Sequence, residues 1–300
     1  MNFSSQRVLA RDVGGTFADA TLLDSQGRIS HTKLPKEWLT EKCECIPNLL
    51  GNEKEYTLHY SISLTLNRFL EGKIPRVALL VNKVFHSFME TARLPHGVTM
   101  GAKTSLVPLG YVQEINGRIN HKGQEIEKLH PEEISKVIEQ IYKQNVDVVV
   151  IALLNSSIEP KHELAVLHQI KSLELGIPII PSSQIVSQRS EYERTLAAIL
   201  SGCLTIFFKK DVDELIKNLP HPPTETFVMR SNGGIAKISD DPLIPVETLL
   251  SGPAAAATRA RIIAQKINLQ NAISLDIGGT STDLSLITSG VFKNPGLPRK

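Results

Sequence analysis

An eight-residue pattern occurs twice in this chain of 300 residues, once near each end. The first copy reads Asp12-Val-Gly-Gly-Thr-Phe-Ala-Asp19, and the second reads Asp276-Ile-Gly-Gly-Thr-Ser-Thr-Asp283. Each copy follows a short apolar run and leads into alternating apolar residues, so each predicts a strand, a tight turn and a second strand. The repeat therefore indicates two structurally related halves.

The residue types in the repeated turn favour phosphate binding. Paired glycines carry no Cβ and permit positive φ, so successive backbone N–H groups can face an anion. The aspartate that ends each first strand is placed to hold Mg²⁺ through its water ligands. Asp12 and Asp276 are therefore the candidate catalytic and metal-binding residues. The candidate cofactor-binding residues are Gly14, Gly15, Thr16, Asp19, Gly278, Gly279, Thr280, Ser281, Thr282 and Asp283.

A single copy of the pattern would also fit a plain β-hairpin with a Gly-Gly turn. Two copies that share five residues at the same spacing favour the phosphate-binding interpretation.

The composition is that of an ordinary soluble globular protein, with 41% apolar and 21% charged residues. A formal net charge of +2 gives no electrostatic reason to expect nucleic acid or an anionic membrane as a partner. The longest apolar run, residues 148–154, is too short to cross a bilayer, and residues 1–11 lack the apolar region of a secretion signal. Three cysteines without zinc-site spacing suit a reducing compartment, so we expect a cytoplasmic protein.

Apolar periodicity predicts an α/β protein with a parallel sheet, and the length suggests two domains. Short apolar runs bounded by turn residues predict strands at residues 8–10, 20–23, 29–34, 77–81, 146–154, 177–180, 227–229 and 272–275. Helical spacing and capping residues predict helices at residues 59–70, 131–141, 160–170, 190–219 and 251–267.

Five motifs stand in the order seen in hydantoinase/oxoprolinase A-type proteins, which the chain resembles over nearly its whole length. Besides the two aspartate-glycine turns, these are Glu191-Tyr-Glu-Arg-Thr195, Ser231-Asn-Gly-Gly234 and Ser251-Gly-Pro-Ala254. The resemblance implies an actin-like ATPase (ribonuclease H-like) fold, a mixed sheet with flanking helices in which two related lobes clamp ATP and Mg²⁺. It also implies an N-terminal lobe over residues 1–182 and an A-type domain over residues 183–300, of which only the beginning precedes Lys300.

The activity implied by the resemblance is ATP-dependent ring opening of a small cyclic amide. Phosphorylation of a lactam or imide oxygen makes the carbonyl carbon reactive toward water, and the protein supplies positioning and charge neutralisation. A second polypeptide or B-type subunit is the expected partner, and a homo-oligomer is left open.

Two further residues are candidate substrate ligands. His59 stands where the family has the histidine of a His-Gly-Thr-Thr motif, and a capping or half-buried histidine is the alternative. Asn232 lies in the Ser-Asn-Gly-Gly loop, which has room for a ligand. Three other functions stay open: a ketone carboxylase component built on the same type of chain, a small-molecule kinase, and a truncated nucleotide-binding module that acts through association.

Overall fold

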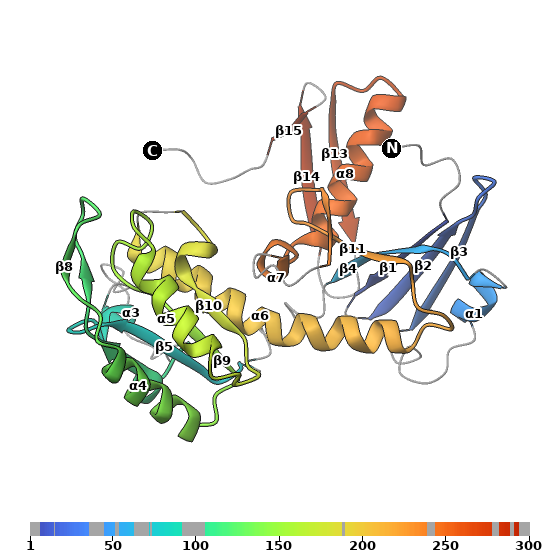
Figure 1. The fold of residues 1–300 in the computed structure, drawn as a ribbon. Helices are drawn as coiled ribbons and strands as arrows, with labels where there is room; N and C mark the ends of the chain where they lie inside the picture. The colour runs from blue at the N-terminus through green and yellow to red at the C-terminus, as the bar shows by residue number, and fades with distance from the viewer. Residues whose placement is uncertain are drawn as a thin grey trace. The chain divides into compact units, whose positions relative to one another are not determined.

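The computed structural model describes residues 7–14, 16–35, 45–51, 54–62, 72, 74–91, 106–187, 190–238, 244–277, 282–288 and 291–293. Contacts divide the chain into two compact units (Figure 1). Unit 1 consists of Met1–Asn67 and Lys210–Lys300, and unit 2 consists of Arg68–Lys209. These units are defined by contacts and do not coincide with the predicted domains, since unit 1 combines both ends of the chain. The predicted domain boundary at residue 182 therefore stays a prediction.

Unit 1 is built on a six-stranded mixed sheet, the main sheet, with the strand order β12-β11-β4-β1-β2-β3. Strands β1, β2 and β3 form an antiparallel meander, whereas β4 is parallel to both β1 and β11. Their bounds are Val8–Val13 for β1, Phe17–Leu23 for β2, Ile29–Pro35 for β3, Thr57–Ile62 for β4, Glu225–Met229 for β11 and Ile235–Lys237 for β12.

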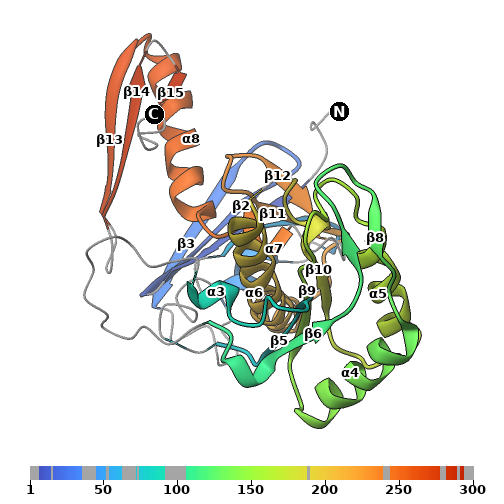
Figure 2. The ribbon, with the colours of Figure 1, turned by 90° about the vertical axis from the view of Figure 1, so that its left-hand side faces the viewer.

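A three-stranded antiparallel sheet, the small sheet, completes unit 1 with β13 (Asn271–Ile277), β14 (Thr282–Thr288) and β15 (Val291–Lys293). Helix α8 (Ser251–Lys266) contacts strands of both sheets, and Figure 2 shows it beside β13 and β14. The remaining short helices of the unit are α1 (Cys45–Leu50) and α7 (Ile244–Glu247).

Unit 2 contains a parallel sheet with the order β10-β9-β5-β6. All six residues of β5 and all four residues of β9 are buried, as expected for strands covered on both faces. The strands are β5 (Val77–Asn82), β6 (Val112–Ile115), β9 (Val148–Ile151) and β10 (Ile179–Pro181), with a separate hairpin of β7 (Arg118–Ile119) and β8 (Glu125–Glu127). The helices are α3 (Phe88–Thr91), α4 (Pro131–Lys143) and α5 (Lys161–Lys171), with 3-10 turns at Leu109–Tyr111 and Ser182–Gln184. Helix α6 (Glu191–Lys217) begins in unit 2 and ends in unit 1.

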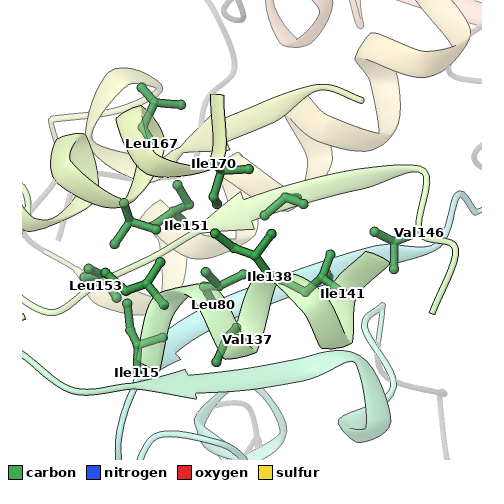
Figure 3. Packing of buried hydrophobic residues seen from close by; sticks show 14 residues of the cluster. Leu80, Ile115, Val137, Ile138, Ile141, Val146, Ile151, Leu153, Leu167 and Ile170 are labelled. Atoms are coloured by element: carbon green, nitrogen blue, oxygen red, sulfur yellow. The ribbon is translucent and has the colours of Figure 1, made fainter. Parts of the chain in front are cut away.

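Helix α4 shows how the sequence builds the core of unit 2. Pro131 occupies the first turn, where its missing N–H costs nothing, and Lys143 lies in the last turn. Ile134, Ile138 and Ile141 recur at helical spacing and pack against aliphatic side chains of β5 and β9 (Figure 3).

Replacing Ile138 by alanine is expected to destabilise unit 2 by about 2 to 5 kcal/mol, because the substitution leaves a cavity in a close-packed core. Urea unfolding followed by circular dichroism measures the change. Tyr142→Ala on the exposed side of the same helix is the control and is expected to stay within about 0.5 kcal/mol of wild type. Equal effects of the two substitutions would contradict the packing described for α4.

Most of the predicted elements are confirmed, with one clear correction. The helix predicted at residues 59–70 is wrong for its first part, because residues 57–62 form β4. Leu58 and Tyr60 are buried on one side of this strand, which is hydrogen-bonded between β1 and β11. Pairing with two distant strands therefore overrides the helical spacing, and residues 63–70 lie outside the described residues. Within the described part of the chain, no helix is both long and apolar enough to span a membrane.

Candidate functional site

The two aspartate-glycine motifs fold into equivalent hairpins. In the first hairpin Asp12 pairs with Asp19 across β1 and β2, and in the second Asp276 pairs with Asp283 across β13 and β14. Each hairpin begins a three-stranded antiparallel meander, β1-β2-β3 or β13-β14-β15. The hairpin geometry is thus present in both copies, and the sequence repeat corresponds to a repeat of structure.

The first turn is closed by a backbone hydrogen bond from Gly14 N to Phe17 O at 2.9 Å. A Cβ at Gly14 would lie 3.3 Å from Phe17 O, so close approach of the backbone favours glycine here, and its φ is not positive. Thr16 is exposed in this turn, and Thr282 is exposed at the start of β14. Phosphate binding by these residues stays a prediction. The predicted residues outside the described part of the chain are Gly15, Gly278, Gly279, Thr280 and Ser281.

Several charged and polar groups act on the carboxylate of Asp12. Its side chain is exposed, yet desolvation by the surrounding protein raises its pKa, and the negative charges of Asp19 and Asp276 raise the pKa further. A hydrogen bond from the Ser61 hydroxyl acts in the opposite direction, as does the charge of Lys33. Asp276 of the second hairpin is thus near enough to Asp12 of the first for its charge to raise the pKa of Asp12.

Lys33 is a residue that the sequence reasoning missed. It lies opposite Asp19 across β2 and β3, and its Nζ is 3.1 Å from Asp19 Oδ2. His31 Nε2 lies 3.5 Å from the other oxygen of the same carboxylate. The predicted meander contained the signal, because antiparallel pairing from the turn at Gly27 places Lys33 opposite Asp19.

Ser61 links Asp12 to the beginning of α8. Ser61 lies opposite Asp12 in the parallel pair of β4 and β1, and its Oγ is 3.4 Å from Ser251 Oγ. Ser251 is the first residue of α8, and the N-cap position before it is taken by Leu250, which makes no side-chain capping bond. The positive end of the α8 dipole therefore lies on the face of the main sheet that carries Asp12.

The two candidate substrate ligands have different surroundings. His59 is half-buried on β4, its ring centroid lies 5.2 Å from that of Phe227, and desolvation lowers its pKa. Its register opposite Ala10 places it on the same face of the sheet as Asp12. Asn232 instead lies in the turn between β11 and β12, where its Oδ1 accepts a hydrogen bond from Gly234 N at 2.9 Å. A substrate role for either residue stays a prediction.

A divalent cation fits the carboxylates at this site. Among the described residues, no group of three or more His, Cys, Asp or Glu side chains is placed to hold a metal ion. Mg²⁺, however, commonly takes only one or two protein carboxylates and completes its shell with water and phosphate oxygens. A bound cation would offset the electrostatic repulsion between the carboxylates of Asp12 and Asp276.

Two family descriptions match the chain. Residues 9–173 match the hydantoinase/oxoprolinase N-terminal region, and residues 194–295 match the hydantoinase/oxoprolinase family. Together they include both hairpins, the main sheet from residue 9 onward, and the strands β5, β6 and β9 of the parallel sheet of unit 2.

Curated relatives match the chain over most of its length. An uncharacterized protein of Methanocaldococcus jannaschii is 28% identical over 92% of this chain and 43% of its own length. The acetophenone carboxylase gamma subunit of Aromatoleum aromaticum is 27% identical, with 94% of this chain and 42% of the relative covered. The caprolactamase subunit alpha of Pseudomonas jessenii is also 27% identical, with 94% and 43% covered. The chain thus spans less than half the length of these relatives, two of which are named as subunits.

Two solved structures resemble the chain in fold. The ATP-dependent caprolactamase from Pseudomonas jessenii superposes with a TM-score of 0.76 at 25% identity, covering 93% of this chain and 43% of that chain. The nucleotide-free structure of acetone carboxylase superposes with a TM-score of 0.75 at 24% identity, covering 94% and 44%. These neighbours and the mixed sheet show the α/β fold of the actin-like ATPase type. The chain therefore belongs to the hydantoinase/oxoprolinase family.

Proposed function

We propose that the chain is the nucleotide-handling component of an ATP-dependent enzyme that opens small cyclic amides. The observation that carries the proposal is the repeated hairpin, in which Asp12 and Asp276 take equivalent positions and the charge of Asp276 raises the pKa of Asp12. Two equivalent hairpins that each carry an aspartate near the end of the first strand suit a triphosphate and its cation better than a single hairpin does. The related caprolactamase is ATP-dependent, which supports the same proposal.

The residues of the site would divide the work as follows. Asp12 and Asp276 would hold Mg²⁺, which when bound neutralises charge on the transferring phosphoryl group. Ser61 holds the Asp12 carboxylate through a hydrogen bond, and Lys33 balances the charge of Asp19. The positive end of α8, beside Ser61, adds an attractive field for an anion on the same face.

His59 is proposed as a substrate ligand in its neutral form. Its lowered pKa means that the imidazole is uncharged at neutral pH, so it can donate one hydrogen bond and accept another. A neutral ring beside Phe227 suits an uncharged cyclic amide. We further propose that the active enzyme contains a second polypeptide, as the subunit names of the relatives suggest, and that it works in the cytoplasm.

A second candidate function is a component of a ketone carboxylase. The acetophenone carboxylase gamma subunit and the acetone carboxylase structure favour it, because each matches this chain as well as the caprolactamase does. The same nucleotide site would then activate a different acceptor.

The test is a turnover assay on the protein purified from its natural source together with its bound subunits. We expect ADP release that depends on Mg²⁺ and on a cyclic amide such as caprolactam, hydantoin or 5-oxoproline, with the ring-opened acid detected by mass spectrometry. ADP release that requires acetone or acetophenone with bicarbonate would replace the proposal by the carboxylase function. A stable phosphorylated product would indicate a kinase, and the absence of any ADP release would exclude all three.

A further inference from the structure

Two buried serine hydroxyls lie beside Asp12 in unit 1. Ser61 is opposite Asp12 in the parallel pair of β1 and β4, so its side chain points to the same face of the main sheet. Ser251 begins α8, and its Oγ is 3.4 Å from Ser61 Oγ. Ser61 is 9% exposed and Ser251 is fully buried, so both hydroxyls are shielded from bulk water. Together they connect the start of a helix to the carboxylate of Asp12.

The direction of the two hydrogen bonds follows from the number of protons. A serine hydroxyl has one proton to donate, whereas an ionised carboxylate only accepts. Ser61 donates its proton to the Asp12 carboxylate, so in the contact with Ser251 the Ser61 oxygen is the acceptor. Ser251 is therefore the donor in that contact. Hydrogen bonds that follow one another in such a chain polarise and strengthen one another.

The position of Ser251 is fixed by the turn before α8. Ser251 N donates a hydrogen bond to Thr248 O at 3.0 Å. Ser231, in the turn between β11 and β12, accepts a hydrogen bond from Leu250 N at 3.1 Å and donates one to Glu247 O at 2.6 Å. Moving the start of α8 away from the β11–β12 turn would break these bonds. The Ser251 hydroxyl is thus held in place from the main sheet itself.

The β11–β12 turn also packs directly on α8. Gly233 has a φ of +84°, and a Cβ at this residue would lie 2.6 Å from Thr258 Oγ1. Glycine therefore permits both the turn conformation and the close approach of the helix. The Ser-Asn-Gly-Gly and Ser-Gly-Pro-Ala motifs are separate in the sequence, but they meet in one support that holds the Ser251 hydroxyl against β4.

We propose that Ser251 is a positioning residue for the nucleotide site. Its hydroxyl fixes the Ser61 hydroxyl, and Ser61 in turn fixes the Asp12 carboxylate for the cation of a bound nucleotide. Ser251 acts on Asp12 only through Ser61. The inference rests on the proposed binding of nucleotide and cation at Asp12, and it holds for either proposed acceptor, a cyclic amide or a ketone.

The test measures nucleotide affinity by calorimetry, with ADP as the probe and the purified complex as the protein. Each titration is run once with Mg²⁺ and once with EDTA. With Mg²⁺, Ser61→Ala is expected to weaken ADP binding about tenfold or more, as is usual when a group that orients a metal ligand is removed. Ser251→Ala is expected to weaken it about three- to tenfold, which corresponds to the loss of one neutral hydrogen bond. Neither substitution is expected to change ADP binding in EDTA, because the Asp12 carboxylate then has no cation to hold.

A double-substitution cycle tests whether Ser251 acts through Ser61. In the Ser61→Ala background, Ser251→Ala is expected to weaken Mg²⁺-dependent binding by less than about twofold, because the hydroxyl that it orients is already absent. Ser61→Thr keeps a hydroxyl on a strand, where β-branched residues are favoured, and is expected to keep most of the affinity that Ser61→Ala loses.

Ser156→Ala is the matched control. Ser156 Oγ lies 3.3 Å from Ser182 Oγ, so these residues form a second buried pair of serine hydroxyls, and the pair belongs to unit 2. Removing the Ser156 hydroxyl is expected to lower the midpoint of thermal unfolding, because a buried hydrogen bond is lost. ADP binding by this variant is expected to match that of wild type, both with Mg²⁺ and with EDTA.

Four outcomes would overturn the proposal. They are unchanged Mg²⁺-dependent binding in Ser251→Ala, equal weakening of its binding with Mg²⁺ and with EDTA, equal weakening by Ser251→Ala and Ser156→Ala, and full additivity of the Ser61→Ala and Ser251→Ala effects. ADP binding by the wild-type complex that does not depend on Mg²⁺ would contradict the proposed function itself, and that failure would be visible without any variant.

Discussion

Replacing Asp12 by asparagine is expected to lower ATP turnover about 100-fold or more while leaving the folded state at least as stable as wild type. The loss of turnover follows from removing one of the two carboxylates proposed to hold the cation. The effect on stability has the opposite sign, because the folded pKa of Asp12 is raised above its unfolded value by desolvation and by the charges of Asp19 and Asp276. Above that folded pKa the ionised carboxylate therefore destabilises the folded state, and a neutral amide removes this penalty.

Turnover is measured as ADP release by the purified complex, and stability as the midpoint of thermal unfolding. Glu225→Gln is a suitable control, because Glu225 lies in the same sheet as Asp12. Its Oε1 forms a solvent-accessible ion pair with Lys237 Nζ at 2.7 Å. Exposed ion pairs of this kind contribute between 0 and about 1 kcal/mol, so this variant should keep both its activity and its stability. Full activity of Asp12→Asn would remove Asp12 from the site, and equal losses in both variants would point to damage outside it.

Replacing Arg194 by methionine is expected to destabilise unit 2 by about 3 to 5 kcal/mol. The Arg194 guanidinium is fully buried, donates hydrogen bonds to Ser182 Oγ and Leu153 O at 3.1 Å each, and forms an ion pair with Glu191. The Ser182 hydroxyl in turn donates to the buried Glu163 carboxylate at 2.6 Å. Removing the cation would leave the Glu191 carboxylate without its ion-pair partner and the buried Ser182–Glu163 hydrogen bond without its neighbouring positive charge.

The network ties together segments at the carboxyl ends of β9 and β10, so its loss should be visible there. Hydrogen exchange followed by mass spectrometry is expected to show faster exchange in these strands of the Arg194→Met variant, together with a lower urea midpoint. Glu139→Gln is the control on α4, since its 2.7 Å pair with Lys143 is exposed, and it should change stability by less than about 0.5 kcal/mol. Unchanged exchange in Arg194→Met would show that the buried network adds nothing to stability.

The parts of the fold that could be predicted from the sequence depend on interactions between near neighbours. Each aspartate-glycine hairpin is specified within eight residues, and the eight-residue spacing places the first and last aspartate opposite one another. Helix α4 likewise has its first-turn proline at Pro131 and its buried stripe within one continuous segment. These signals need no knowledge of where the rest of the chain lies.

The parts that could not be predicted depend on distant segments. Strand β4 takes its conformation from β1 and β11, and its Ser61 meets Ser251 across 190 positions of sequence. The role of Arg194 was hidden for the same reason, because Glu163 and Leu153 come from other elements of unit 2. The hydrogen bond from Gly234 N to Asn232 Oδ1 joins residues only two positions apart, and the substrate role of Asn232 stays a prediction.

The alanine run of α8, residues 254–257, has a mechanical consequence. The helix contacts β4 and β11 of the main sheet and all three strands of the small sheet, so it lies between the two sheets. Alanine is the smallest side chain that keeps a helix intact, and it lets two sheets approach one helix closely. We therefore expect a bulkier residue in the alanine run to move the small sheet away from the main sheet, and with it Asp276 from Asp12, while each hairpin keeps its own strand pairing.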